Sequence, residues 1–372
     1  MKTFSIFIFT ILGFTTFGQD VWIQRDSING APRSVSAAFV ANGDGHVVGG
    51  LDEDGFRRSM FSYTPWQNDW DDEPKIGGLN GSGLARGSAS AFTIAEKGYV
   101  CLGQGETNPF FKDLWEFDPV TNIWTQKADF IGSPRRQAVA FTLYDMGYVG
   151  TGIDATGFKK DMFKYDASTN TWTQINDFGG TARKEAVAFE MGHHAYLGTG
   201  DDGVMRNDFW QYDPTTDNWV QKANFPGTAR KGAIGWGQFP QAFIGTGEDI
   251  NFSYTNDLWE YNYWADAWVQ RADFMGAGRS NAVAFRIGSI AYVGSGYNGI
   301  FFDDFYAYQR ILNLAEISEV AEINIFPNPV QEHFQVKSKI DELQVKLFDM
   351  QGRDITNNLT IEHNGKTIDI ER

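Results

Sequence analysis

The sequence predicts an all-β protein built as a ring of six four-stranded sheets, and three recurring patterns lead to this prediction. A segment of alternating aromatic residues that ends in Trp, such as "DFWQYDPTTDNW" at 208–219, stands in five related copies. An Arg follows each of these Trp residues, and an alternating apolar segment that ends in a pair of glycines follows each Arg. Such self-similarity at a fixed period indicates one structural unit repeated along the chain.

Each repeat starts at an Arg that precedes its first strand. The segment after the Arg alternates apolar and small residues, as in "KEAVAFEMGHHAYLGTG" at 184–200, which predicts two strands joined by a tight turn. A loop of seven to nine residues follows the glycines, and the aromatic segment then supplies a third and a fourth strand. Four short strands in a repeat of 47 to 49 residues are typical of a β-propeller blade. The six arginines are Arg33, Arg86, Arg135, Arg183, Arg230 and Arg279.

The sixth blade needs a strand from the N-terminus. The last repeat ends in "DDFYAYQR" at 303–310 and has no Trp of its own, whereas "VWIQRD" at 21–26 matches "AWVQRAD" at 267–273. Trp22 also precedes Arg33 by 11 residues, the spacing found in four other repeats. We therefore expect 21–26 to form the outer strand of the sixth blade, which leaves no open sheet edge. A ring of blades also buries sheet faces that one blade cannot bury alone.

The repeats resemble the kelch family of β-propellers. A pair of glycines closes the second strand, as at Gly49-Gly50, and a Tyr or Phe stands seven residues before the Trp, as Tyr165 does before Trp172. Thr-Gly or Gly-x-Gly replaces the Gly-Gly of the family in the other repeats. The resemblance covers about residues 21–310 and implies a six-bladed kelch propeller, which we place at 19–310.

Both ends of the chain carry signals of export. The first 18 residues combine Lys2 with an apolar run and small residues at the end, which is typical of a cleaved secretory signal peptide. After a linker at 311–322, "FPNP" and "VKLFDMQGRDI" in 323–372 resemble the C-terminal sorting domain of the type IX secretion system of Bacteroidota. The resemblance implies a small β-sandwich, the secretion machinery as a partner, and a protein secreted or held at the outer-membrane surface. We expect this domain to be truncated, because its relatives continue beyond "NGKTIDI" into a further strand.

Composition argues against several classes of function. The net charge of −16 disfavours a protein that neutralises nucleic-acid phosphates. Apart from the signal peptide, no apolar run predicts a transmembrane span. The single cysteine, Cys101, lies inside an apolar strand and is expected to be a core thiol that forms no intrachain disulfide. His193 and His194 are adjacent on a strand and point to opposite faces, so they do not chelate one metal together. We therefore expect no metal and no cofactor.

The predicted binding surface is the face at which the inner strands begin. In an antiparallel meander the six arginines and the six loops after the glycines lie at the same end, and each loop carries a large apolar residue. The arginines either satisfy carbonyls and carboxylates inside the protein or form an anion site at the mouth of the channel. For the repeated aspartates, of which Asp161 is one, we expect turn formation or pairing between blades. The binding residues predicted from this face are Arg33, Arg86, Arg135, Arg183, Arg230, Arg279, Phe56, Phe111, Phe158 and Phe302.

These observations favour a binding or interaction module for a glycan or a protein over an enzyme. The alternative is a carbohydrate-active enzyme that resembles the six-bladed kelch mutarotases of sialic acid, with Glu248 near Arg230 and Arg279 as the acting residues. A protein like galactose oxidase is less well supported, because it would need a copper site that the few histidines do not supply. A structural surface protein without a small ligand is a third interpretation. The sequence does not identify the ligand.

Overall fold

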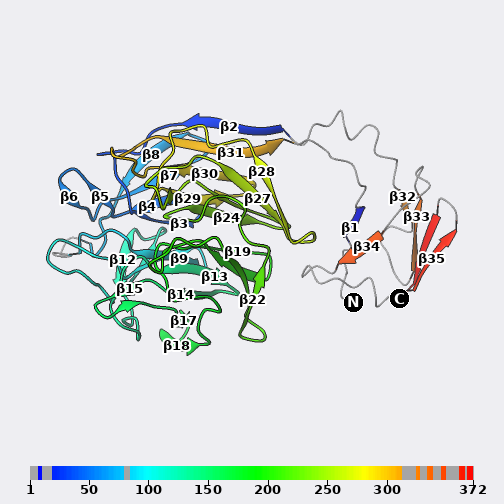
Figure 1. Cartoon of the computed structure of the whole chain (residues 1–372), viewed down its shortest axis with the longest axis horizontal. Helices are drawn as coiled ribbons and strands as arrows, with labels where there is room; N and C mark the ends of the chain where they lie inside the picture. Colours follow the sequence, from blue (N-terminus) through cyan, green and yellow to red (C-terminus); the bar gives the residue numbers. More distant parts are fainter. Residues whose placement is uncertain are drawn as a thin grey trace. The chain divides into compact units, whose positions relative to one another are not determined.

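The computed structural model describes residues 7–10, 19–78 and 84–311, and five strand segments between 324 and 371. The chain divides into two compact units: Asp20–Gln309, and Met1–Gln19 together with Arg310–Arg372. The first unit contains six antiparallel four-stranded sheets, so the predicted all-β, six-bladed propeller is confirmed (Figure 1). The described residues contain no helix long and apolar enough to cross a membrane.

The blades follow one another along the chain, and the four strands of each blade are ordered from the channel outward. Blade 1 contains β3 (Ala37–Ala41), β4 (Asp44–Val48), β7 (Met60–Thr64) and β8 (Asp69–Glu73). Blade 2 contains β9 (Ser90–Ile94), β10 (Lys97–Cys101), β11 (Leu114–Asp118) and β12 (Ile123–Gln126). Blade 3 contains β13 (Val139–Leu143), β14 (Met146–Gly150), β17 (Met162–Asp166) and β18 (Thr171–Ile175).

The other three blades repeat this order. Blade 4 contains β19 (Val187–Met191), β20 (His194–Gly198), β21 (Phe209–Asp213) and β22 (Asn218–Lys222). Blade 5 contains β24 (Ile234–Gln238), β25 (Gln241–Gly245), β27 (Leu258–Asn262) and β28 (Ala267–Arg271). Blade 6 contains β29 (Val283–Ile287), β30 (Ile290–Gly294), β31 (Phe305–Ile311) and, as its outer strand, β2 (Gln19–Arg25). Short strand pairs stand in three of the loops: β5 (Leu51–Asp52) with β6 (Gly55–Phe56), β15 (Ile153–Asp154) with β16 (Gly157–Phe158), and β23 (Arg230–Lys231) with β26 (Glu248–Asp249).

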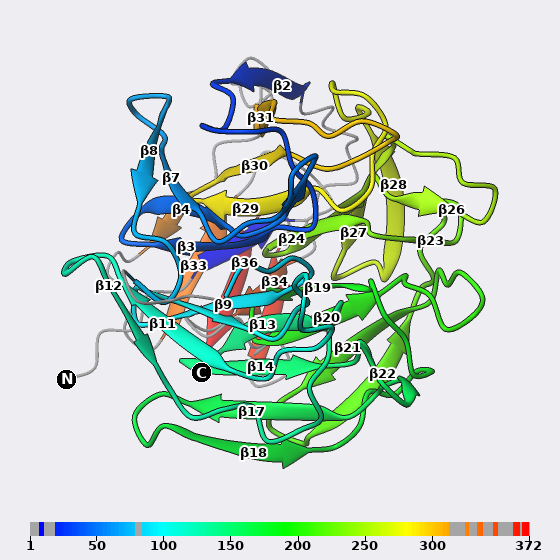
Figure 2. The ribbon, with the colours of Figure 1, turned by 90° about the vertical axis from the view of Figure 1, so that its left-hand side faces the viewer.

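The ring closes through β2, as the sequence predicted. β2 pairs with β31, and the two strands lie side by side at the edge of blade 6 (Figure 2). Trp22 donates its Nε1–H to the carbonyl of Ala272 in the connection out of blade 5, at 3.2 Å. Its ring also contacts Phe274 and Tyr308, at centroid distances of 5.1 and 4.9 Å. The N-terminal strand therefore completes one sheet and packs against the neighbouring blade.

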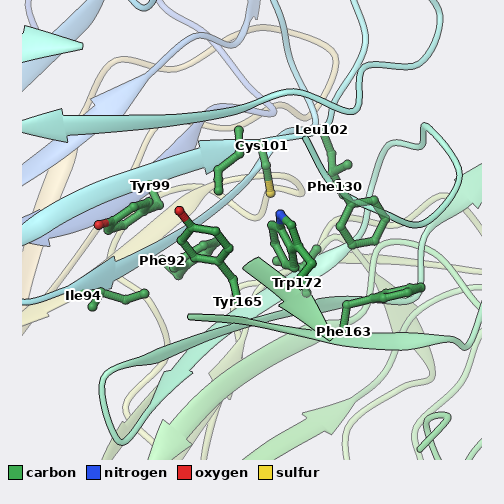
Figure 3. Close-up of a cluster of buried hydrophobic side chains, with 11 residues drawn as sticks. Phe92, Ile94, Tyr99, Cys101, Leu102, Phe130, Phe163, Tyr165 and Trp172 are labelled. Carbon is green, nitrogen blue, oxygen red and sulfur yellow. The ribbon is translucent and has the colours of Figure 1, made fainter. Parts of the chain in front are cut away.

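Aromatic side chains fill the spaces between blades. Between blades 2 and 3, the ring centroids of Tyr99 and Tyr165 lie 5.8 Å apart, and Trp172 belongs to the same buried cluster (Figure 3). The Nε1–H of Trp172 donates to the carbonyl of Ala128 in the connection out of blade 2, at 3.0 Å. Cys101 is fully buried in this cluster, and burial raises the pKa of its thiol far above the usual range. This confirms the prediction that Cys101 is a core thiol.

The inner strands surround the central channel (Figure 2). In each of them, side chains that pack inside the blade alternate with side chains that face the channel, such as Ala140 of blade 3. Glycine is required where the second strand of a blade ends. Gly152 has a φ of 90°, and a Cβ there would come within 2.7 Å of the Arg136 carbonyl.

The second unit is described by strands alone. β32 (Asn324–Phe326), β33 (His333–Lys337), β36 (Thr367–Glu371) and β35 (Thr360–Asn364) form an antiparallel sheet in that order. β1 (Phe7–Thr10) pairs with β34 (Val345–Phe348). The predicted signal-peptide cleavage after Gly18 and nearly all of the predicted linker at 311–322 lie outside the described residues.

Candidate binding face

The six arginines do not point around the channel mouth. They satisfy carbonyls and carboxylates inside the protein, which is the first of the two alternatives that the sequence left open. Each is only 0–2% exposed, and its guanidinium group lies inside a blade. In five blades the Nη1 and Nη2 atoms donate to the two carboxylate oxygens of one aspartate, at 2.5 to 3.0 Å. The pairs are Arg86–Asp113, Arg135–Asp161, Arg183–Asp208, Arg230–Asp257 and Arg279–Asp304.

Each of these pairs connects two strands of the same blade. The Arg precedes the first strand of the blade and the Asp precedes the third, so the expected pairing between blades is wrong. The Nη1 atom of each Arg also donates to the carbonyl at the end of the second strand, as Arg135 does to Thr151 at 3.1 Å. A planar cation with five donors can satisfy all of these acceptors at once. Ligand binding by the six arginines stays a prediction, but in the five blades with an Arg–Asp pair both Nη atoms of the Arg are engaged inside the protein.

The residue two positions after each Arg forms a ring at the channel mouth. All six members have left-handed backbones, with φ between 50° and 59°, and they include a Val, for which this conformation is unusual. The N–H of each donates to the carbonyl of its counterpart in the preceding blade, at 2.7 to 3.1 Å. The hydrogen bonds run through all six blades and return to the first. The members of this mouth ring are Val35, Ser88, Gln137, Glu185, Gly232 and Asn281.

The mouth ring lines a recess of about 130 Å³ together with the small residues that follow it. Three polar atoms in its wall are buried without a hydrogen-bond partner: Ser88 Oγ, Gln137 Oε1 and Glu185 Oε2. Glu185 forms only a long ion pair, with its Oε2 atom 3.6 Å from Lys184 Nζ. Buried polar atoms are normally paired, so this wall is prepared to exchange hydrogen bonds with water or with a ligand.

Basic residues stand on one side of the recess. The residue directly after the Arg is Arg136, Lys184 or Lys231 in blades 3 to 5, whereas it is Ser or Gly in the other blades. Lys184 Nζ lies 3.7 Å from an oxygen of Asp201, and Lys231 Nζ lies 3.7 Å from an oxygen of Glu248. The two lysines are half-buried and loosely paired, and Arg136 donates to Gln104 Oε1. They do not line the recess themselves, but each stands next to a member of the mouth ring in the chain.

The aromatic residues predicted for the rim divide into two groups. Phe56, Phe158 and Phe302 are half-buried in the loops. Phe111 is only 7% exposed, because its ring lies under the guanidinium of Arg86 with the cation 4.1 Å from the ring centroid. Its expected exposure is therefore wrong. The loops of blades 4 to 6 present other apolar side chains to solvent. The sequence pattern alone does not show which apolar loop residues are exposed. The exposed ones are Val204 (58%), Ile250 (62%), Phe252 (75%) and Ile300 (64%).

The residues weighed for a mutarotase-like site are not arranged around one opening. Glu248 pairs with Lys231, while Arg230 and Arg279 are fully buried and bonded to Asp257 and Asp304. No group of three or more His, Cys, Asp or Glu side chains arranged to hold a metal ion occurs among the described residues. The geometry provides a polar recess and a charged rim, which suit recognition.

Comparison with known proteins identifies the C-terminal unit. Residues 324–372 match the family model described as the secretion system C-terminal sorting domain. No curated protein matches the chain. The chain therefore combines a six-bladed β-propeller with a sorting domain of type IX secretion, and it is exported to the cell surface or to the outside.

Proposed function

We propose that the propeller is a kelch-type binding module whose ligand, a glycan or a protein, is received at the channel mouth. The observation that carries this proposal is the wall of the recess, in which Ser88, Gln137 and Glu185 each bury a polar atom without a partner. A cavity of about 190 Å³ continues from the recess along the starts of the inner strands, so the ligand contacts proposed here are those of the mouth ring.

The residues around the recess take different parts in this proposal. The mouth ring supplies hydrogen bonds, and Arg136, Lys184 and Lys231 supply positive charge at one side. The six buried arginines act as positioning residues, because each holds in place the strand start that carries a member of the mouth ring. The half-buried rings of Phe56, Phe158 and Phe302 offer apolar contact at the rim. Export places this face where glycans and surface proteins are found.

A glycan array probed with the full-length chain tests this function. We expect Gln137→Leu and Glu185→Leu to weaken the binding of a ligand found on the array by at least about tenfold, since each removes an acceptor from the recess. Gln137→Leu should also keep or raise the melting temperature, because it removes a buried oxygen that has no hydrogen-bond partner, and Glu185→Leu should lower it little, because it removes only a long ion pair with Lys184. Gln174→Leu, on the exposed side of β18, is the control and should change neither property. Equal binding by the parent and both mouth variants would contradict the proposal.

A further inference from the structure

Blade 1 departs from the other five at its buried arginine. Where the other blades have an aspartate before the third strand, blade 1 has Ser59. Arg33 Nη1 donates to Ser59 Oγ at 2.8 Å and to the Gly49 carbonyl at 3.4 Å, and Arg33 Nε donates to the Ala31 carbonyl at 3.0 Å. Its Nη2 atom, which meets an Asp oxygen in every other blade, donates to no group among the described residues. Arg33 is thus a buried cation, 2% exposed, whose internal carboxylate is missing.

A hollow of about 530 Å³ lies at this place. Its lining includes four cations, and one of them, Lys75, is exposed. The single carboxylate in the lining, that of Asp52, is bonded to Arg57 at 2.5 Å and also acts on the charge of Arg33, and Arg57 pairs with Asp54 as well, at 2.7 Å. In a chain of net charge −16, this hollow therefore concentrates positive charge. The four cations are Arg33, Arg57, Arg58 and Lys75.

The other blades show which group fits beside this arginine. Their Asp side chains are 14–26% exposed, so the position that a carboxylate takes next to the Arg reaches the surface. Both oxygens face the guanidinium there, in the two-pronged geometry that Arg and carboxylates prefer. The shorter side chain of Ser59 leaves that position to a carboxylate from outside.

We propose that this hollow binds the carboxylate of an acidic sugar, a uronate, which pairs with Arg33 as the aspartates of the other blades pair with theirs. The half-buried ring of Phe56 and the buried ring of Phe61 line the same hollow and provide an apolar wall for the sugar ring. Burial lowers the pKa of Arg33, and a bound carboxylate would counter that effect by stabilising the charge. The proposal goes beyond the mouth site: it shares Arg33 and Phe56 with that site but does not depend on the mouth ring or on Arg136, Lys184 and Lys231.

Titration calorimetry of the full-length chain with trigalacturonate at low ionic strength tests this inference. Ser59→Asp supplies the internal carboxylate that the other blades have, so we expect the affinity to fall by at least about tenfold. The same variant should raise the melting temperature, which shows that the protein is folded and that Arg33 is paired. Lys75→Met removes an exposed cation of the hollow and should weaken binding by about three- to tenfold. Lys112→Met, at an exposed Lys of blade 2, is the matched control and should leave the affinity within about twofold.

Two further ligands and one further variant show whether the hollow binds the carboxylate of a sugar or that of a peptide. The methyl ester of trigalacturonate has no charge and should bind at least about tenfold more weakly than the acid. Tetraglutamate carries carboxylates on a peptide, and binding of tetraglutamate without binding of trigalacturonate would show that the hollow is a protein site. Gln137→Leu leaves the hollow intact and should bind trigalacturonate as the parent does. The proposal is overturned if trigalacturonate gives no binding, if its ester binds equally well, or if Ser59→Asp binds like the parent.

Discussion

At the scale of single residues, the guanidinium groups buried inside five of the blades are stabilised by a carboxylate that pairs with their charge. Removing one partner of a buried ion pair leaves the other charge without compensation, which costs far more than the pair contributes. Asp161→Ala should therefore lower the free energy of unfolding by about 3 to 5 kcal/mol, because it leaves Arg135 fully buried and without its carboxylate. Urea unfolding followed by Trp fluorescence measures this loss.

Blade 1 supplies the control for that experiment. Ser59 stands where the Asp stands in the other blades, and its hydroxyl accepts a hydrogen bond from Arg33 but carries no charge. Ser59→Ala should therefore lower the free energy of unfolding by only about 1 kcal/mol, the value of one hydrogen bond. Similar losses for Asp161→Ala and Ser59→Ala would show that the ion pairs contribute little to the blades.

His46 makes the stability of the propeller depend on pH. The side chain is 2% exposed and stacks on Phe39 with ring centroids 4.9 Å apart, and burial lowers its pKa to about 4. In an unfolded chain the pKa is about 6.5, so protons bind the unfolded state first as the pH falls. The stability contributed by neutral His46 is complete above about pH 6.5 and is lost progressively toward pH 4, by up to about 3 kcal/mol.

His46→Phe tests this dependence, because Phe keeps the stacking and does not titrate. Between pH 7 and pH 4 the melting temperature of the variant should fall less than that of the parent. His193→Phe is the matched control for the loss of one histidine and is measured over the same pH range. His193 is half-buried and lies on a turn, not on the strand that the sequence led us to expect. If His46→Phe and the parent lose stability in parallel, another group causes the loss.

At the scale of the element, β2 is the strand whose loss would open the ring. Trp22 is half-buried and bonds or packs to Ala272, Phe274 and Tyr308. Trp22→Ala should lower the free energy of unfolding by about 2 to 4 kcal/mol, since truncation of a packed aromatic side chain removes apolar contact and leaves a void. Ile23→Ala changes the next residue, which is 40% exposed, and should cost less than about 1 kcal/mol. Equal effects of the two substitutions in thermal unfolding would contradict the role of β2 in closure.

One blade junction breaks the rule that the Trp side chains follow. Six Trp residues stand on the outer strands, one in each blade. Five of them donate their Nε1–H to a carbonyl of the connection out of the preceding blade, and Trp219 does not. At that junction Asn176 replaces the Ala found at Ala128 and Ala223, and its side chain bonds to the Asp217 carbonyl at 2.7 Å. Asn176 thereby makes a side-chain contact that Ala cannot make, and this contact distinguishes the junction between blades 3 and 4 from its counterparts.

At the scale of the whole molecule, the repeat predicted the order of the blades, because each period of the sequence forms one four-stranded sheet. The spacing from Trp22 to Arg33 was sufficient to predict ring closure before any strand was placed. The pairing of the arginines inside the blades could also have been predicted from the sequence. An Asp follows the Arg by 25 to 27 residues in five repeats, and Ser59 takes its place in the first repeat. The unpaired atoms of the mouth ring could not be predicted, because they depend on left-handed backbones whose residues share no common type.

We expect the two units to have separate tasks, export and ligand binding. Residues 324–372 carry the sorting domain, whereas every residue of the proposed binding sites lies within Asp20–Gln309, which is compact by itself. Deleting 324–372 should therefore stop export of the protein to the cell surface, which fractionation and surface labelling of the producing cells would measure. The shortened protein should retain the ligand affinity of the parent and the melting transition of the propeller, because the deletion leaves all strands of the six blades in the chain. Loss of ligand binding in the folded, shortened protein would place part of the binding site in the sorting domain and contradict the division.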